Sequence, residues 1–373
     1  MKLVHLRNVV LSVAMAAGLA LPPSAALAQQ AAASPPFSAE SSSIVPANGD
    51  LNPYGVAFVP PGFPTGGKIA AGDILVTNFN NIKNLQGTGK TIVALTPNGA
   101  VAPLVQAGQP GTAKTFFTST LGGLSTALGV LKGGYVIVGN LPTTDGTFNT
   151  VGQGALQVVN DKGVMVAKFT DAQLLDSPWG MAIADDGKTA HVFVSNAIST
   201  AVTRLELSVG SNTVTLVSKQ KIASGYAWAP NSGALVVGPT GLAYDGGSDT
   251  LYVASTDDNA IYSIAKASTT TTSVFKGKTV FSNTHLRGPV GLALAPNGHL
   301  FAVNGDAVNA DPTHPSEIIE FTTGGKFIAE SNLDAGEGGG FGIATVADGA
   351  GLRMAAVDDV PNVVLVLTLP TVP

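Results

Sequence analysis

The sequence predicts an all-β chain folded as a six-bladed β-propeller, and three observations lead to this prediction. A motif returns six times: a small residue opens an apolar run, a turn follows, and a second apolar run ends in Asn, Ser or Asp. The opening residues lie between 50 residues (Gly241 to Gly291) and 72 residues (Gly55 to Ala127) apart. Glycine is abundant, at 45 of 373 residues, and charged residues make up only 12% of the chain, about half the usual share. Such units, each with three or four short strands, are typical of a propeller.

Each unit is expected to contribute its strands in the same order. The small residues that open the first strands are Gly55, Ala127, Gly180, Gly241, Gly291 and Gly342. The second strands are expected at residues 74–78, 136–140, 192–196, 251–255, 300–304 and 354–358. The third strands are expected at residues 91–95, 155–159, 202–207, 260–264, 317–321 and 362–369. Runs such as residues 135–138 are apolar without interruption, which indicates strands covered on both faces. A β-sandwich would also contain many short strands, but it does not explain the regular return of the motif.

The sixth unit lacks a fourth strand after residue 369. We expect residues 43–45 to supply it, so that an N-terminal strand pairs with the last blade and closes the ring. Closure removes the exposed sheet edges that would otherwise template aggregation.

The N-terminal residues are predicted to be an export signal. Lys2 and Arg7 precede an apolar run at residues 9–21, and the small-residue pattern that ends at Ala28 follows. This is the pattern of a secretory signal peptide. The expected organisation is therefore a signal peptide at residues 1–28, a flexible lead-in at 29–49 and the propeller at 50–373. The protein is expected to be periplasmic or secreted.

The composition of the chain limits the classes of molecule that it is expected to bind. The formal net charge is −5, which argues against nucleic acid as a partner, since phosphates require basic patches. The apolar run near the N-terminus is shorter than the ~20 residues of a membrane span, so no span is expected. The chain has no cysteine, so no disulfide stabilises it. We expect a monomer.

Polar side chains recur where the second strands end. They are Asn78, Asn140, Asn196, Ser255, Asn304 and Asp358. Sixfold repetition should gather them on one face of the ring, near the central channel. Their oxygens could bind a polar ligand, or a hard cation such as Ca2+, which takes 6–8 oxygen ligands. The alternative is structural: Asn and Asp at strand ends satisfy main-chain groups of the following turn.

Aromatic residues and long connections should lie at the same mouth of the channel. Tyr54, Trp179 and Phe341 precede the first strands of their units. They could stack on a ligand at a pocket rim, or they could plug the channel. The connections at residues 78–90 and 140–154, and a third at 304–315, are long enough to suggest binding loops.

Two families resemble this pattern. Residues 238–243, 251–255 and 259–261 are similar to an NHL repeat, with Ser255 in place of the usual Asp, which unit six keeps as Asp358. The resemblance covers residues 52–369 and implies the propeller fold far more than a function. The related SMP-30/gluconolactonase group implies a divalent metal in the central well. Its ligands here would be Glu337, Asn196, Asn304 and Asp358.

The functional prediction is an exported NHL-type propeller that acts as a binding scaffold for a small polar ligand, a glycan or a protein. Its expected ligand-binding residues are Tyr54, Asn78, Asn140, Trp179, Asn196, Asn304, Phe341 and Asp358. No cofactor is expected in this case. The alternative is a metal-dependent lactonase or esterase in which Ca2+ or another divalent ion polarises an ester carbonyl. A third interpretation is a purely structural envelope protein with a filled channel.

Overall fold

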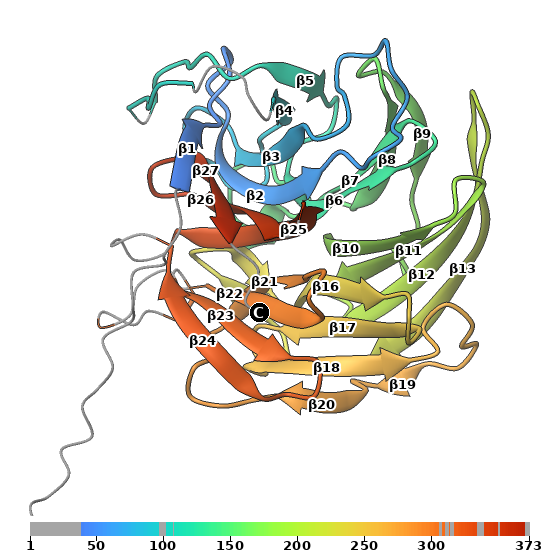
Figure 1. Cartoon of the computed structure of the whole chain (residues 1–373). Coiled ribbons are helices and arrows are strands. Elements are labelled where there is room, and N and C mark those ends of the chain that lie inside the picture. Colours follow the sequence, from blue (N-terminus) through green and yellow to red (C-terminus); the bar gives the residue numbers. More distant parts are fainter. Residues whose placement is uncertain are drawn as a thin grey trace, which may run out of the picture. The chain divides into compact units, whose positions relative to one another are not determined.

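A computed structural model describes residues 39–96, 102–106, 108–305, 308–309, 313, 317–333, 339–349 and 351–369. All of them belong to the second of two compact units, Ala32–Pro373. This unit is an all-β six-bladed propeller, as predicted, with the first strands of the blades around the centre (Figure 1). Within the described residues, no helix is long and apolar enough to cross a membrane.

Each of the first three blades is an antiparallel sheet ordered from the centre outward. Blade 1 consists of β2 (Leu51–Phe58), β3 (Ile74–Asn80), β4 (Thr91–Leu95) and β5 (Thr115–Thr118). Blade 2 consists of β6 (Leu124–Leu131), β7 (Tyr135–Asn140), β8 (Ala155–Asn160) and β9 (Met165–Phe169). Blade 3 consists of β10 (Pro178–Asp185), β11 (Thr189–Asn196), β12 (Ala201–Val209) and β13 (Val214–Ser224). The short β19 (Val274–Phe275) adds a parallel fifth strand to blade 3.

The other three blades follow the same plan. Blade 4 consists of β16 (Pro239–Asp245), β17 (Thr250–Ser255), β18 (Ala260–Ala265) and β20 (Lys278–Phe281). Blade 5 consists of β21 (Pro289–Leu294), β22 (His299–Asn304), β23 (Glu317–Thr322) and β24 (Phe327–Asn332). Blade 6 consists of β25 (Gly340–Asp348), β26 (Gly351–Asp358), β27 (Val363–Leu369) and β1 (Ala39–Ser43). Two elements lie outside this plan: the hairpin of β14 (Ala229–Asn231) and β15 (Leu235–Val237), and the single turn η1 (Phe148–Thr150).

The predicted ring closure is confirmed. Strand β1 pairs antiparallel with β27, from Ala39 opposite Leu367 to Ser43 opposite Val363. The pairing segment begins before the predicted residues 43–45, because Ile44 and Val45 leave the strand and pack in the core. The last blade is therefore built from both ends of the propeller.

The small residue of the repeated motif is required where two blades meet. A Cβ on Gly180 would overlap the carbonyl oxygen of Thr240 in the next blade, and one on Gly342 would overlap that of Tyr54. In every blade the pairing of the first and second strands is also interrupted beside the small residue. Such bulges redirect side chains, and here they bring neighbouring first strands into contact.

A buried hydroxyl bridges two of these seams. Thr77 Oγ1 accepts from Gly55 N at 2.7 Å and donates to the carbonyl of Ser125 at 2.9 Å. Ser195 does the same between blades 3 and 4. Both residues directly precede a strand-end Asn, so the motif also encodes contact between blades.

Separate apolar clusters fill the spaces between successive blades. In β7, Val136 and Val138 pack toward blade 1, and Ile137 packs toward blade 3. Both faces of the strand are therefore covered, as its uninterrupted apolar sequence predicts.

Candidate functional site

The mouth of the channel where the second strands end is filled by aromatic side chains. Tyr54 stacks on Phe79 and on Phe341, with ring centroids 4.3 Å apart in each case. Trp179 meets Tyr54 edge-on at 5.5 Å. All four side chains are fully buried. Three of them are the aromatic residues that the sequence places at this mouth, and their geometry is that of a plug.

The β14–β15 hairpin covers this plug. Its residues Leu235, Val236 and Val237 are buried in the same apolar cluster as the aromatic rings. Asp258 holds the chain just before the hairpin, because its carboxylate accepts from Ala227 N at 3.0 Å and from Lys276 Nζ at 2.7 Å. The sequence analysis did not separate this hairpin from the blades, since its short apolar runs resemble blade strands.

The strand-end residues are fully buried. The side-chain N–H groups of the four Asn residues donate to main-chain carbonyls, whereas the Oδ1 atoms of Asn78, Asn140 and Asn196 have no hydrogen-bond partner among the described residues. Asn304 is the clearest case: its side chain donates to the carbonyl of His285 at 2.9 Å and accepts from Arg287 N at 2.9 Å. The corresponding amides donate to main-chain carbonyls in the segments that enter each blade. These pairs are Asn78 with Ile44, Asn140 with Gly122, and Asn196 with Leu174. Each amide thus fixes the approach to its blade, which is the structural alternative considered for these residues.

Three of the residues implied as metal ligands are described, and each forms a hydrogen bond in or beside its own blade. Asn196 and Asn304 are bonded within blades 3 and 5, and Asp358 accepts from Val360 N at 3.1 Å in blade 6. Glu337 lies outside the described residues. Within the described ranges, no group of three or more His, Cys, Asp or Glu side chains could hold a metal ion. The described geometry therefore gives this set no specific support.

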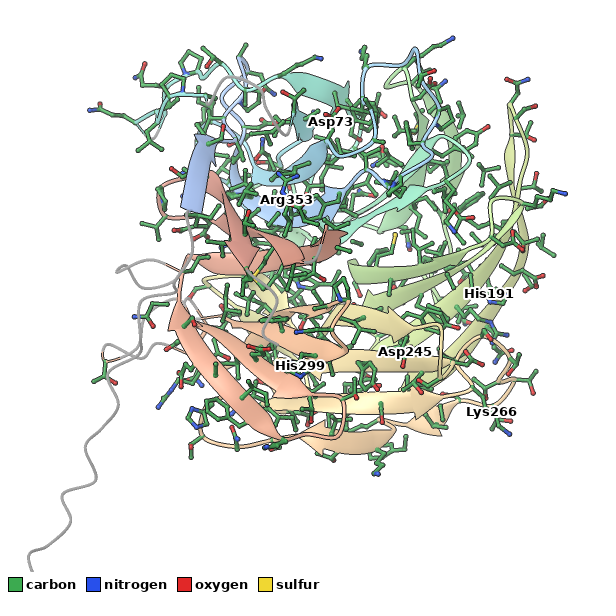
Figure 2. The ribbon with its side chains drawn as sticks, in the orientation of Figure 1. Asp73, His191, Asp245, Lys266, His299 and Arg353 are labelled. Carbon is green, nitrogen blue, oxygen red and sulfur yellow. The ribbon has the colours of Figure 1, made fainter. Side chains whose placement is uncertain are left out.

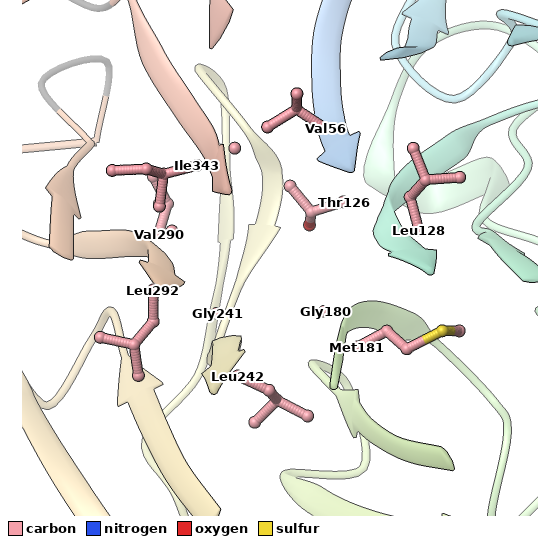
Figure 3. A pocket seen from close by; sticks show the side chains of 12 residues that line it. Val56, Thr126, Leu128, Gly180, Met181, Gly241, Leu242, Val290, Leu292 and Ile343 are labelled. Atoms are coloured by element: carbon pink, nitrogen blue, oxygen red, sulfur yellow. The ribbon is translucent and has the colours of Figure 1, made fainter. Parts of the chain in front are cut away.

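The opposite end of the channel is open, and mostly apolar side chains line it together with main-chain polar groups. A cavity of about 370 Å³ lies there, lined by the first strands of all six blades. It narrows toward the plug into a space of about 50 Å³, whose lining side chains surround the centre in Figure 3. The residue that follows the small residue of the motif lines both spaces in every unit. These residues are Val56, Leu128, Met181, Leu242, Leu292 and Ile343.

This site was not predicted from the sequence, although its signal was present. Six large apolar residues occupy the same position of the repeat, directly after the six small ones. Such residues are usually core. Only the bulge in each first strand shows that they face the channel.

Charged groups lie around the open end. Arg353 of β26 places its guanidinium 5.9 Å from the ring centroid of Phe58, a lining residue, and 3.8 Å from Asp348 (Figure 2). Asp245 lines a neighbouring cavity of about 400 Å³. Hydrogen bonds from the Ser248 hydroxyl and from main-chain N–H groups hold the pKa of Asp245 below its usual value. Asp245 is therefore ionised at neutral pH.

The plugged end carries an exposed tryptophan that packs on a partly buried phenylalanine. Trp228 is 39% exposed and lies over Phe148 of η1, with ring centroids 5.9 Å apart. Three segments meet around the pair: Thr143 N donates to the carbonyl of Gly87 at 2.9 Å, and Gln86 donates to that of Ser232 at 2.6 Å. We name residues 81–90, 141–154 and 225–238 the loop face. Two of its segments belong to the long connections that the sequence singles out.

Known proteins share the fold with this chain. The chain matches no known family and no curated protein sequence. Among solved structures it is similar to a putative oxidoreductase (glucose dehydrogenase) from Thermus thermophilus, at 12% identity and a TM-score of 0.51, covering 89% of this chain and 100% of that one. It is also similar to the PQQ domain of pyranose dehydrogenase from Coprinopsis cinerea, at 9% and 0.51, covering 90% and 98%. A gluconolactonase from Xanthomonas campestris gives 14% and 0.43, covering 89% and 98%.

At these identities the likeness shows the propeller fold alone. The resemblance to NHL repeats stays a prediction from the sequence.

Proposed function

We propose that this chain is an exported binding module that holds a protein partner on its loop face. The observation that carries the proposal is Trp228, which is 39% exposed and lies over the partly buried ring of Phe148 where three segments meet. Exposed Trp is enriched among the residues that dominate the energy of protein interfaces. Its flat ring supplies a large contact area, and its N–H offers a donor.

The order of the loops supports binding without a large folding cost. Asp145 Oδ1 accepts from Thr147 N at 2.9 Å and from Thr150 Oγ1 at 2.6 Å, which fixes the segment that carries Phe148. These hydrogen bonds hold the pKa of Asp145 below its usual value, so they persist at neutral pH. A surface that is already ordered loses less entropy on binding.

The filled mouth favours a partner that lies on the surface over a small polar ligand that enters the channel. Tyr54, Trp179 and Phe341 are buried against each other and beneath the hairpin. The side-chain N–H groups of the strand-end Asn residues beside them already donate to main-chain carbonyls. A glycan remains the competing partner for an exposed tryptophan. No described contact favours the lactonase alternative.

The test immobilises the chain, exposes it to the extracellular proteins of its source and to a glycan array, and measures what is retained. We expect one protein to bind, and Trp228→Ala to weaken that binding by at least about 2 kcal/mol, or roughly 30-fold. Ile328→Ala is the matched control, because Ile328 is similarly exposed on the outer strand of blade 5. Retention that depends on Trp228 for glycans alone would reassign the partner. Retention unaffected by Trp228→Ala would overturn the proposal.

A further inference from the structure

We propose that the open end of the central channel binds a small molecule through an aliphatic chain. This site lies at the opposite end of the channel from the loop face and is independent of the proposed function. The argument rests on the shape of the cavity, the chemistry of its lining and the plug that closes its far end.

The cavity is a blind pocket. Its wide part of about 370 Å³ lies in the range of roughly 300–1,000 Å³ that is typical of small-molecule sites. The narrow part of about 50 Å³ ends near Val290, which also belongs to the apolar cluster of the plug. A ligand can therefore enter from one end and cannot pass through. A chain fits this tapering shape better than a broad ring system.

The side chains of the lining are almost entirely apolar. Among the described residues, no charged side chain lines either space. The lining includes Phe58, Ile183, Leu294 and Val346 besides the six repeated residues. These side chains favour a ligand in proportion to the apolar area that it buries. The main-chain groups exposed between them must keep water or meet a polar part of the ligand.

Two hydroxyl groups in the wide cavity are already used. Tyr244 donates to Asp249 Oδ1 at 2.9 Å, and Thr345 donates to the carbonyl of Leu294 at 3.0 Å. A sugar needs several convergent hydrogen-bond partners from the lining, and these two side chains do not offer them. The polar groups that remain are main-chain groups, because each first strand pairs with another strand on one side only. These can serve a single polar end of a ligand, or water.

The charged groups stay outside the lining. Arg353 and Asp245 lie beside the cavity rather than in it. The aliphatic part of the ligand is therefore what the pocket recognises. The polar end of the ligand, whether neutral or anionic, would contact the charged groups at the rim.

The test is a chain-length series measured by calorimetry: 1-hexanol to 1-dodecanol, the matching carboxylates, and glucose. We expect affinity to rise about fourfold for each added methylene until the pocket is full, since burying one CH₂ contributes ~0.8 kcal/mol. Glucose should show no binding. The ratio between alcohols and carboxylates then reports whether the rim prefers an anion.

Two variants locate the site. Ala344→Phe fills the wide cavity, and Met181→Gln adds a polar group at nearly constant volume; each should weaken decanol binding at least about tenfold. Ala347→Phe is the matched control, because Ala347 lies on the same strand, is exposed and does not line the cavity. Circular dichroism checks that each variant is folded, and Met181→Gln keeps the test valid if Ala344→Phe does not fold. Affinity that is independent of chain length, or equal in all variants, would overturn the proposal.

Discussion

Replacing Gly180 by alanine tests the reasoning about how the blades are joined. Gly180 lies at the seam between blades 3 and 4, where an added Cβ would overlap the carbonyl oxygen of Thr240 and come within 3.1 Å of Ser195 Oγ. That hydroxyl accepts from Gly180 N at 2.8 Å and donates to the Thr240 carbonyl at 2.6 Å. The methyl group must therefore push apart the two strands that the hydroxyl joins.

The magnitude follows from two contributions. Overpacking a tight interior costs about 1–3 kcal/mol, because neighbouring atoms leave their preferred positions. Weakening the two hydrogen bonds of Ser195 costs about 1 kcal/mol each. Gly180→Ala should therefore lower the free energy of unfolding by about 3–5 kcal/mol. At ~2 °C per kcal/mol for a chain of this size, the Tm should fall by about 6–10 °C.

The assay is urea unfolding followed by circular dichroism, with calorimetry for the Tm. Gly246→Ala is the matched control, because a Cβ there meets only Tyr244 at an ordinary contact distance of 3.7 Å. Ser195→Ala separates the two contributions, since it removes the bridge and leaves the space. A Gly180→Ala protein within about 0.5 kcal/mol of the wild type, the usual range for surface substitutions, would refute the account of the seam.

Three further predictions concern the plugged end. Millimolar Ca2+ should leave the Tm unchanged and EDTA should not lower it, because the side chain of Asn304 is already bonded to the main chain of its own blade. A rise in Tm that EDTA reverses would restore the metal-dependent alternative. Asn304→Ala should lower the free energy of unfolding by about 1–3 kcal/mol, since Arg287 N loses its acceptor. Urea unfolding measures this, and an unchanged urea midpoint would argue against a structural role for Asn304. Burial disfavours the charged form of Asp258, but hydrogen bonds from Lys276, from a main-chain N–H and from a serine outweigh it and hold its pKa below the usual value. The stability that it contributes is therefore present above the unfolded pKa of ~3.9 and is lost as pH falls below it. In a Trp228→Phe background, acrylamide should quench the fluorescence of the buried Trp179 only at low pH. Quenching that is independent of pH would contradict this prediction.

Much of the fold can be predicted from the sequence because each blade of the propeller is encoded by the same motif. Gly241 and Gly291 open equivalent strands, and their pairing is interrupted at the same place, so the strands of a clear unit predict those of a weaker one. The closing strand was also predictable, since the sixth unit lacks its outer strand. The exact pairing residues were not, because Ile44 and Val45 have the same apolar character whether they pair or pack.

The candidate sites were harder to predict for a physical reason. Asn304 and Trp179 were recognised as residues that meet at one mouth, but local sequence does not show whether a polar or aromatic side chain is exposed or buried. Burial depends on what covers the side chain. Here the cover is the β14–β15 hairpin, whose residues come from the connection between blades 3 and 4 and pack on rings from blades 1, 3 and 6.

The sequence by itself determined the number of blades, their order and the way the ring closes, because these depend on a repeated pattern and on local strand chemistry. Only the tertiary structure decided which end of the channel is filled and which is open. That difference arises from contacts between residues far apart in the chain, such as Tyr54 with Phe341 and Val237 with the same cluster. Apolar side chains line the open end because a bulge in each blade turns one repeated residue toward the channel. That direction is decided only when the six first strands surround a common axis.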